Sequence, residues 1–363
     1  MNILFVGAYD TPDFGGVNEY MLRLSQQLEK KGHHCMVIRQ SKRTFDATIE
    51  GIKFINLAVK GPRYMGFFFY LVATRHIIKN KIPADVICFQ SCLLYNQCYN
   101  RLFPRGYKVC CVQHSFALDN PKNNKAIGRC ILWVEKLTAI GKVNIITVSE
   151  HNARLIKERL KKDAAIVRCG INITSTHKTD NSIIERLGLT ADEYYLTISR
   201  IDPVKNLDIL IKGYLDYKGQ KKLVIGGDVD NVYGRALVQL AQMDKRIIFV
   251  GPVWGDTKDS LLNNCFSYVL LSSSEGFPIS LLEAMSYGKR CVVSDISPIK
   301  EALGEKLGYW CKVGSADDVT KQLYEMDKCE NRKAIEQGIL KRVSSNYTWE
   351  MAADSFHNYI CGL

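Results

Sequence analysis

The start of the chain alternates between two patterns of hydrophobic positions. Residues 3–7 form a continuous apolar run, which is typical of a buried strand. Apolar side chains then recur at helical spacing from Val17 to Leu28, and Gly32 follows where a helix C-terminal cap is expected. The pattern returns to a strand over residues 34–38. This order of strand, helix and strand predicts a parallel sheet and an α/β protein.

Similar alternation continues along the chain. Further strands are predicted at residues 86–89, 108–112, 144–148, 194–199, 222–225, 247–250, 268–271 and 291–293. Helices are predicted at residues 67–79, 126–139, 150–160, 207–215, 234–242 and 279–287. A polar stretch at residues 172–192 interrupts the pattern and is the best candidate for a linker. Because 363 residues exceed what one hydrophobic core usually supports, two parallel-sheet domains in tandem are predicted.

Two glutamates follow the predicted strand at residues 268–271. Glu275 lies in the loop, and Glu283 lies inside a helix that begins near Pro278. The N-terminus of that helix favours a bound phosphate, because its N–H groups are free and its dipole is positive there. Apolar neighbours surround Glu283 in the sequence, so its carboxylate needs polar partners, and ribose hydroxyls would serve. The pair suggests a sugar-nucleotide site, and capping or salt bridging is the structural alternative.

The loop at residues 199–206 also lies between a predicted strand and a predicted helix. Arg200 and Lys205 bring two fixed positive charges to it, and together they could neutralise a diphosphate. A solvated basic pair is the alternative. Ligands of parallel sheets bind at the carboxyl ends of strands, so we expect these loops to line a cleft between two facing domains.

The N-terminal half holds two weaker candidates. Gly15 and Gly16 end a loop after the first strand, where glycines let backbone approach a ligand, and an ordinary turn is the alternative. His114 follows the strand at residues 108–112 and could hydrogen-bond a sugar or assist proton movement. A structural histidine is the alternative.

Asp228 and Asp230 form a DxD motif, which chelates a divalent metal in some nucleotide-sugar enzymes. Here the motif follows Gly226 and Gly227 after a strand, so a turn explains it better. We therefore expect no metal site and no cofactor.

Charge is divided unevenly along the chain. The net charge is +12, but residues 1–180 carry +14 and residues 181–363 carry −2. A basic half suggests an anionic partner such as a membrane surface, a phosphorylated acceptor or nucleic acid, and a solvated basic face is the alternative. No aromatic-interleaved basic motif supports nucleic acid. Residues 67–70 are aromatic and lie between Arg63 and Arg75, so they could dock onto lipid or pack in a buried helix.

Cysteine usage and the N-terminus indicate a cytoplasmic protein. The 13 cysteines are an odd number without zinc-site spacing, which is typical of buried thiols in a reducing compartment. The first residues lack the basic region of a signal peptide, and the most apolar window is too short to span a bilayer.

Together these segments resemble family 4 glycosyltransferases, which are retaining enzymes of the GT-B fold with two facing Rossmann-like domains. The segment EGFPISLLEAMSYGKRCVVSD is similar to the family's E-x7-E segment, and SRIDPVKNLDILIKGY is similar to its strand, loop and helix with Arg and Lys. GGVNEYMLRLSQQLEKKGHHCMVI resembles its glycine loop and first helix. LVIGGD, IIFVGPV and YTWEMAADSFHNYI fit as well, so the resemblance extends over nearly the whole chain.

The resemblance implies a role for each candidate residue in binding a nucleotide-sugar donor. Glu283 would bind the ribose, and Glu275 would lie near the donor sugar with the amides of Gly276 and Phe277. Arg200 and Lys205 would hold the diphosphate, and Gly15 and Gly16 would approach it from the other domain. His114 would lie beside the sugar, and the nucleobase near Val253. The catalytic set would be His114, Glu275, Arg200 and Lys205, with no metal.

The resemblance also implies that the last helix returns to the first domain. The expected domains are therefore residues 1–175 with 347–363, which bind the acceptor, and residues 176–346, which bind the donor. The chain departs from the family at Lys289 and Arg290, at residues 169–172 and at Ser115. We expect these departures to bear on the sugar and the acceptor, because none of them removes a donor-phosphate contact.

The predicted function is transfer of a sugar, with retention, from a nucleotide diphosphate donor to a glycan or lipid-linked acceptor in surface polysaccharide biosynthesis. A UDP-linked donor is expected, and the enzyme would be a metal-independent hexosyltransferase. A nucleotide-sugar epimerase or hydrolase of the same fold is the alternative function. A peripheral position on the inner face of the cell membrane is compatible with the basic half.

Overall fold

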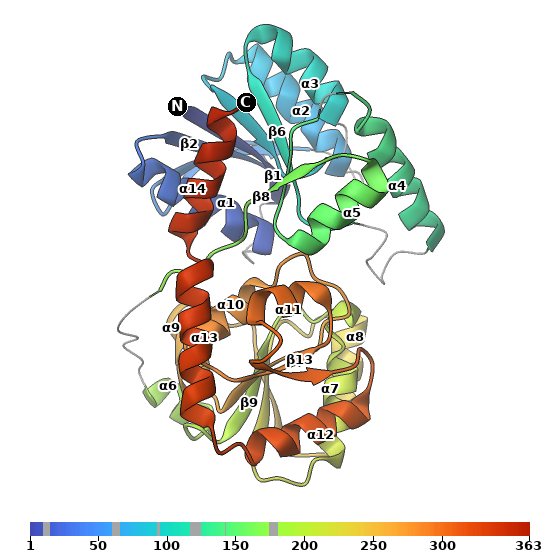
Figure 1. Cartoon of the computed structure of the whole chain (residues 1–363), viewed down its shortest axis with the longest axis vertical. Coiled ribbons are helices and arrows are strands. Elements are labelled where there is room, and N and C mark those ends of the chain that lie inside the picture. The colour runs from blue at the N-terminus through green and yellow to red at the C-terminus, as the bar shows by residue number, and fades with distance from the viewer. Residues whose placement is uncertain (10–14, 60–65, 93–94, 117–124, 142, 174–180) are drawn as a thin grey trace. The chain divides into compact units, whose positions relative to one another are not determined.

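The computed structural model describes residues 1–9, 15–59, 66–92, 95–116, 125–141, 143–173 and 181–363 (Figure 1). By its internal contacts the chain divides into two compact units. Unit 1 holds residues 1–119, 123–170 and 349–363, and unit 2 holds residues 120–122 and 171–348.

Unit 1 is built on a sheet with the strand order β3-β4-β2-β1-β5-β6-β7-β8 in the described residues. Its strands are β1 (Asn2–Tyr9), β2 (His34–Ser41), β3 (Phe45–Ile49), β4 (Ile52–Ala58), β5 (Val86–Phe89), β6 (Lys108–Gln113), β7 (Ile145–Thr147) and β8 (Ala164–Ile166). Its helices are α1 (Gly16–Lys30), α2 (Gly66–Lys79), α3 (Tyr95–Leu102), α4 (Lys125–Thr138), α5 (Glu150–Leu160) and α14 (Trp349–Cys361), with the short 3-10 helix η2 (Phe103–Arg105).

The core of unit 1 forms where the sequence has its apolar runs. Residues 3–6 of β1 are fully buried at the centre of the sheet, as expected for a strand covered on both faces. Helix α14 packs against α1 (Figure 1), and its Phe356 ring lies 5.4 Å from the ring of Phe5. A segment from the far end of the sequence therefore completes this core.

One strand of unit 1 departs from the parallel arrangement. β3 pairs antiparallel with β4 through a turn at Glu50 and Gly51, whose φ angles are 45° and 87°. Two positive φ values in a two-residue turn suit a tight hairpin. The sequence prediction missed both strands of this hairpin.

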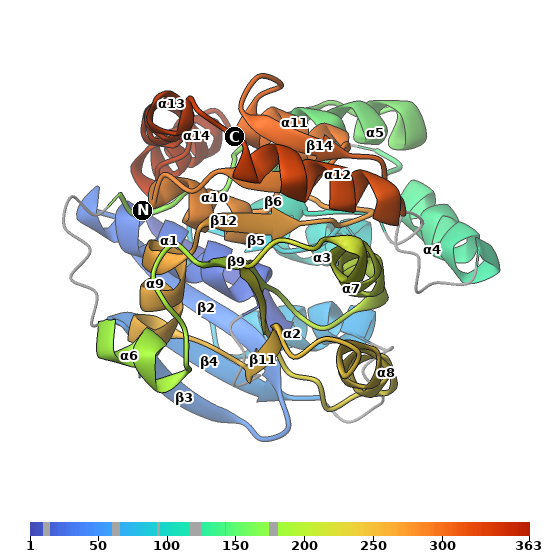
Figure 2. The same ribbon diagram turned by 90° about the horizontal axis from the view of Figure 1, so that it is seen from below.

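Unit 2 is built on a second sheet, with the order β11-β10-β9-β12-β13-β14, and its strand pairs are parallel. Its strands are β9 (Tyr194–Ile198), β10 (Lys222–Gly226), β11 (Ile247–Gly251), β12 (Ser267–Leu270), β13 (Cys291–Ser294) and β14 (Gly308–Cys311). Its helices are α6 (Asn181–Arg186), α7 (Leu207–Asp216), α8 (Val232–Ala241), α9 (Gly255–Asn264), α10 (Ile279–Ser286), α11 (Ser297–Leu303), α12 (Ala316–Asp327) and α13 (Arg332–Asn346), with the 3-10 helix η4 (Pro203–Lys205). Helices α7 and α12 pack side by side (Figure 2).

The prediction of an α/β protein with two Rossmann-like parallel sheets is confirmed. The prediction of a linker over residues 172–192 is wrong for its second half. Helix α6 occupies residues 181–186, and Ile184 and Leu189 are buried in unit 2. Polar residues surround these apolar side chains in the sequence, so the sequence does not indicate that Ile184 and Leu189 are buried.

The aromatic segment at residues 67–70 divides between two environments. Phe69 and Tyr70 are buried in the core of unit 1, whereas Phe68 is 41% exposed. The side chain of Phe67 and all of Arg63 lie outside the described residues. Packing of α2 onto the sheet therefore accounts for only part of the segment.

Candidate functional site

Lys205 and Glu275 form an ion pair at the carboxyl edge of the unit 2 sheet. Lys205 ends η4, which follows β9, and Glu275 lies in the loop after the neighbouring strand β12. The Lys205 Nζ atom lies 2.6 Å from Glu275 Oε1, and the two side chains are 14% and 13% exposed. Ser272 donates a second hydrogen bond of 2.6 Å to the same oxygen. The structure thus brings together two residues that the sequence assigned to different parts of a donor.

Backbone contacts hold the two loops together. Ser273 N–H donates to the Val204 carbonyl at 2.8 Å, and the Asn206 side-chain amide donates to the Leu271 carbonyl at 2.9 Å. Asn206 adopts a left-handed conformation with φ 50°, which Asn tolerates better than most residues. Asp202 fixes the start of η4 by accepting a hydrogen bond from Val204 N–H. The Lys205–Glu275 pair is therefore attached to a rigid scaffold, which reduces the cost of ordering it around a ligand.

Glu283 lies one turn inside α10 and has a cationic partner. Lys258 of α9 places its Nζ atom 2.7 Å from Glu283 Oε1, and the side chains are 27% and 19% exposed. This ion pair fits the salt-bridging alternative for Glu283, but the sequence did not identify Lys258 as the partner. The reason is that α9 and α10 meet only through the tertiary fold, and no local spacing signals the contact.

The start of α10 offers backbone donors near these carboxylates. Pro278 is the N-cap residue and makes no side-chain cap, which leaves the first-turn N–H groups to other partners. Phe277 is buried, with its ring 5.4 Å from the ring of Tyr347. This packing fixes the Gly276–Phe277 backbone just before the helix. The segment therefore has the features of an anion-binding helix terminus.

Tyr268 of β12 is a buried residue that links two strands next to this segment. Its hydroxyl donates to the Ile198 carbonyl at 3.0 Å, and the residue is fully buried. Burial raises the pKa of Tyr268 above its ordinary value, so the hydroxyl stays protonated and keeps donating. The contact ties β12 to the end of β9, and sequence reasoning missed it.

The other predicted donor residues of unit 2 lie at the same edge of the sheet. Arg200 is exposed in the loop between β9 and η4. Val253 follows β11 and is buried. Gly227, with φ 153°, brings β10 so close to β9 that an added Cβ would lie 2.3 Å from the Ser199 carbonyl oxygen. Only glycine lets these two loops approach each other so closely.

The candidates of unit 1 lie at the carboxyl edge of its own sheet. His114 directly follows β6, and its Nε2 atom lies 2.9 Å from Gln90 Oε1, so Nε2 is the donor. The Tyr20 ring meets the His114 ring edge to face at 5.2 Å, and Asn152 donates to the His114 carbonyl. Gly15 is the N-cap of α1, and among the described residues that are not its chain neighbours no atom lies within 4 Å of where its side chain would be. Gly16 begins α1 and is exposed, and the rest of that loop, residues 10–14, lies outside the described residues.

Burial lowers the pKa of His114 to about 4, so its ring is neutral at pH 7. An unfolded histidine takes up a proton near pH 6.5, as is typical of the free side chain. The unfolded state therefore binds more protons between about pH 6.5 and 4, and stability falls as the pH falls through this range. We expect the stability difference between the wild-type protein and His114→Gln to shrink from pH 7 to pH 5. Urea unfolding of both proteins at each pH measures this difference, and a pH-independent difference would contradict the assignment.

The DxD motif forms a turn. Asp230 N–H donates to Asp228 Oδ1 at 2.9 Å, and the Asp230 carboxylate pairs with Arg235 at 3.2 Å. Both aspartates are exposed, and Asn231 caps α8 directly after them. The turn interpretation is confirmed. Among the described residues, no cluster of His, Cys, Asp and Glu has metal-site geometry.

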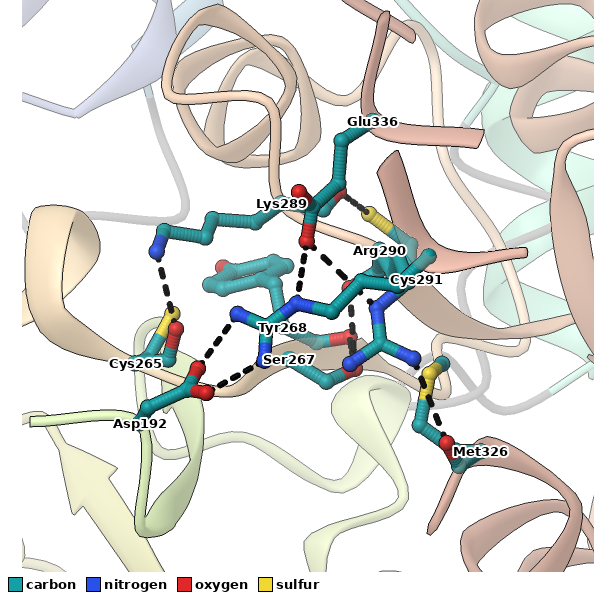
Figure 3. Close-up of polar contacts among 10 residues, drawn as sticks. Asp192, Cys265, Ser267, Tyr268, Lys289, Arg290, Cys291, Met326 and Glu336 are labelled. Carbon is teal, nitrogen blue, oxygen red and sulfur yellow. Dashed lines mark hydrogen bonds and ion pairs between the residues drawn. The ribbon is translucent and has the colours of Figure 1, made fainter. Parts of the chain in front are cut away.

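Lys289 and Arg290 lie far from the carboxyl edge. They precede β13, so they belong to the amino edge of the sheet, opposite the loops that follow β9 and β12. Arg290 is 1% exposed, and its Nε atom lies 3.7 Å from Glu336 Oε1 (Figure 3). Lys289 donates to the Cys265 carbonyl at 2.9 Å. The expectation that this departure bears on sugar or acceptor is wrong, because both side chains hold α13 and α9 to the sheet.

Two Rossmann-like units, each with candidate side chains at the carboxyl edge of its sheet, define the GT-B fold class. Comparison with known families agrees with this assignment. Residues 14–175 match the model of Glycosyltransferase Family 4, and residues 180–340 match that of Glycosyl transferases group 1. The chain belongs to the group 1 glycosyltransferases of the family 4 type, and the resemblance found in its motifs is confirmed.

Three known proteins illustrate the similarity. The N,N'-diacetylbacillosaminyl-diphospho-undecaprenol alpha-1,3-N-acetylgalactosaminyltransferase of Campylobacter jejuni is 44% identical over 64 residues, which are 17% of this chain and 17% of that protein. The lipopolysaccharide 1,6-galactosyltransferase of Escherichia coli is 33% identical over 117 residues, which are 30% of this chain and 31% of that protein. The chain thus spans less than a third of the length of either relative. The crystal structure of Anabaena HepE with UDP and glucose matches with a TM-score of 0.80 and 17% identity, over 100% of both chains.

Proposed function

We propose that this protein is a retaining glycosyltransferase that takes a hexose from a UDP-linked donor. The observation that carries the proposal is the Lys205–Glu275 pair beside the N-terminus of α10, with Arg200 in the same loop as Lys205. A departing diphosphate needs preorganised positive charge and backbone donors, and this edge of unit 2 supplies both. The fold shared with Anabaena HepE, whose structure contains UDP and glucose, supports UDP as the nucleotide.

When the donor binds, Lys205 and Glu275 would separate, and each would contact a part of the donor instead. Lys205 and Arg200 would bind the diphosphate, and Glu275 would then accept hydrogen bonds from sugar hydroxyls. Glu283 would bind the ribose in the same way, by leaving Lys258. Val253 would lie against the base, and the Gly276 and Phe277 amides would donate to sugar and phosphate. From unit 1, Gly15 and Gly16 would approach the diphosphate, and His114 would lie beside the sugar.

The reaction in this proposal needs no covalent enzyme intermediate. The bond between the sugar C1 and the phosphate oxygen breaks, and its electron pair leaves with the diphosphate. The acceptor hydroxyl oxygen forms the new bond on the same face of the sugar, and its proton passes to the departing phosphate oxygen. Arg200, Lys205 and the α10 N-terminus would stabilise the negative charge that develops, so the proposal involves no metal ion.

The proposed acceptor is a glycan or a lipid-linked sugar in surface polysaccharide assembly. Two relatives support this choice: the Campylobacter protein is named for an undecaprenol diphosphate-linked acceptor, and the Escherichia coli protein for lipopolysaccharide. The basic half of the chain agrees with an anionic acceptor or carrier.

Thermal unfolding with UDP, GDP and ADP tests the donor part of the proposal. A ligand that binds only the folded state raises the melting temperature, and at about 100 times its dissociation constant it adds about 2.7 kcal/mol. We expect UDP to raise the melting temperature more than GDP or ADP, and Glu283→Ala to reduce the UDP shift. Lys212→Ala, an exposed change on α7, should leave the shift intact. A protein that responds to none of the three nucleotides would contradict the proposal.

A further inference from the structure

Helices α2, α3 and α4 form one neighbouring layer of unit 1, with η2 between α3 and β6. The exposed side of this layer carries large apolar side chains on each segment except α3 itself. They are Phe68 and Val72 on α2, Phe103 on η2, and Trp133, Leu137 and Ile140 on or just after α4. We call the exposed side of α2, α3, η2 and α4 the α2–α4 face.

The apolar residues of α4 form a stripe along the helix. Trp133 and Leu137 are 63% and 43% exposed, and their spacing of four residues puts them on one side of the helix. Ile140, which is 65% exposed, follows just after the helix. Glu135 lies on the opposite side, where it is buried and accepts a hydrogen bond of 3.0 Å from Gln113. The face of α4 that carries Glu135 therefore packs against unit 1, and the apolar stripe is exposed to solvent.

The exposed charges of the same face are all positive. In the described residues of α2, α3, η2 and α4, no acidic side chain is exposed, because Glu135 is the only acid in these segments and is buried. The exposed basic residues are Arg75, Lys79, Arg101, Arg105, Arg129 and Lys136. Arg129 and Lys136 are four and three residues away from Trp133, so they flank the stripe on α4.

Three of the exposed apolar residues of unit 2 differ in both respects. Val232, Met243 and Val313 are also exposed, but they lie singly on different segments. Each has acidic residues close in the sequence, namely Asp230, Asp244 and Asp317. Scattered exposed apolar residues are normal on a folded protein, whereas a grouped set with charge of one sign needs an explanation.

We propose that the α2–α4 face docks on the surface of an anionic lipid bilayer, with Trp133, Leu137 and Ile140 entering the headgroup region. Basic side chains attract anionic headgroups, and an exposed apolar stripe with a Trp adds partial insertion. Charge complementarity selects this occupant, since the face has no exposed acid with which to pair a basic partner. Among the described residues no helix is long and apolar enough to cross a membrane. Docking would bring the enzyme to its acceptor only if the proposed lipid-linked acceptor is correct. Binding of the α2–α4 face to a bilayer does not itself depend on sugar transfer.

Co-sedimentation of the full chain with vesicles tests the inference. Vesicles of phosphatidylcholine with phosphatidylglycerol should retain the protein, those of phosphatidylcholine alone should retain little, and high salt should weaken the binding. The variant Trp133→Ser/Leu137→Ser/Ile140→Ser should bind the anionic vesicles at least about tenfold more weakly. The variant Arg129→Glu/Lys136→Glu should lose a similar amount or more, because each reversal turns an attraction into a repulsion.

Matched controls come from unit 2. The variants Val232→Ser/Met243→Ser/Val313→Ser and Lys245→Glu/Lys306→Glu make the same kinds of change at exposed positions and should bind like the wild type. Equal losses in control and test variants, or vesicle binding that ignores lipid charge, would overturn the inference. It would also be overturned by a dimer in sedimentation velocity that dissociates in the triple Ser variant, because the face would then join two copies. UDP-induced stabilisation of the same samples reports on the donor site separately, so failure of docking and failure of the proposed activity are distinguishable.

Discussion

Replacement of Lys205 by Ala is expected to lower donor turnover by about 10²–10³-fold, which is the usual cost of removing one preorganised group from a developing charge. Arg200→Ala and Glu275→Ala should each cause losses of the same order. Lys205 lies 2.6 Å from Glu275 in a mostly buried pair, so its charge is held at the sheet edge before any donor arrives. Release of nucleotide from UDP-sugars, measured with and without an acceptor, gives the rates.

The double variant Lys205→Ala/Glu275→Ala separates catalysis from folding. If the pair only supports the loops, removing both partners should restore what one substitution loses, because no buried charge is left unpaired. If each residue contacts the donor, the double variant should remain as slow as the single ones. Wild-type rates of donor turnover in both Arg200→Ala and Glu275→Ala would contradict the assignment of the donor site.

The products of the same assay distinguish the enzyme classes that share this fold. Transfer gives a new glycoside with the anomeric configuration of the donor, and only when an acceptor is present. Free sugar or an epimerised donor formed without acceptor would instead indicate a hydrolase or an epimerase.

Glu336→Gln is expected to destabilise the protein by roughly 2–3 kcal/mol. Glu336 contacts Arg290 at the amino edge of the unit 2 sheet, away from the candidate donor site at the carboxyl edge. Breaking a buried ion pair costs about 3–5 kcal/mol, and partial exposure of Glu336 reduces this figure. Arg290 is 1% exposed, and its Nε atom lies 3.7 Å from Glu336 Oε1 (Figure 3). The Cζ atom of Arg290 lies 4.4 Å from the centroid of the Phe266 ring. Without the Glu336 carboxylate, a desolvated cation loses its acidic partner. Thermal unfolding should show a fall in melting temperature of roughly 5–10 °C.

Arg290→Met supplies the matched control for this prediction. Methionine fills much of the same volume without a charge, so Arg290→Met should cost less than Glu336→Gln. The double variant should recover part of the lost stability, because the contact between Arg332 and Glu336 stays broken in it. Arg332 keeps its own contacts with Asp192 and Glu336 in the Arg290→Met variant. Strictly additive effects of the two substitutions would show that Arg290 and Glu336 do not interact.

The sequence was sufficient where one local pattern decides the structure. The apolar run at residues 86–89 becomes β5 with the same bounds, because a buried parallel strand needs only a short apolar segment. The β3–β4 hairpin was missed although residues 45–58 alternate and contain Gly51. That glycine, at φ 87°, follows Glu50, which does not suggest a tight turn in the way that Asn or Asp would.

The sequence indicated single residues of the candidate site, but it did not indicate which of them contact each other. Lys205 and Glu275 are 70 positions apart and meet because β9 and β12 are neighbours in a sheet whose order differs from the order of the chain. Lys258 of α9 and Glu283 of α10 meet only through the tertiary fold, which no periodicity encodes. Gln90 fixes the protonated nitrogen of His114 from the end of the adjacent strand β5 for the same reason. Loop positions after strands can be read from a sequence, and contacts between loops depend on strand order.

The packing of α14 on α1 has a consequence for biosynthesis. Phe356 and Ile360 are fully buried in unit 1, while unit 2 is encoded between α5 and α14. The first unit therefore cannot complete its core until α14 has been made, whereas the second unit does not include α14. A released chain truncated after residue 348 should show a protease-resistant second unit and a first unit that chaperones and proteases still reach.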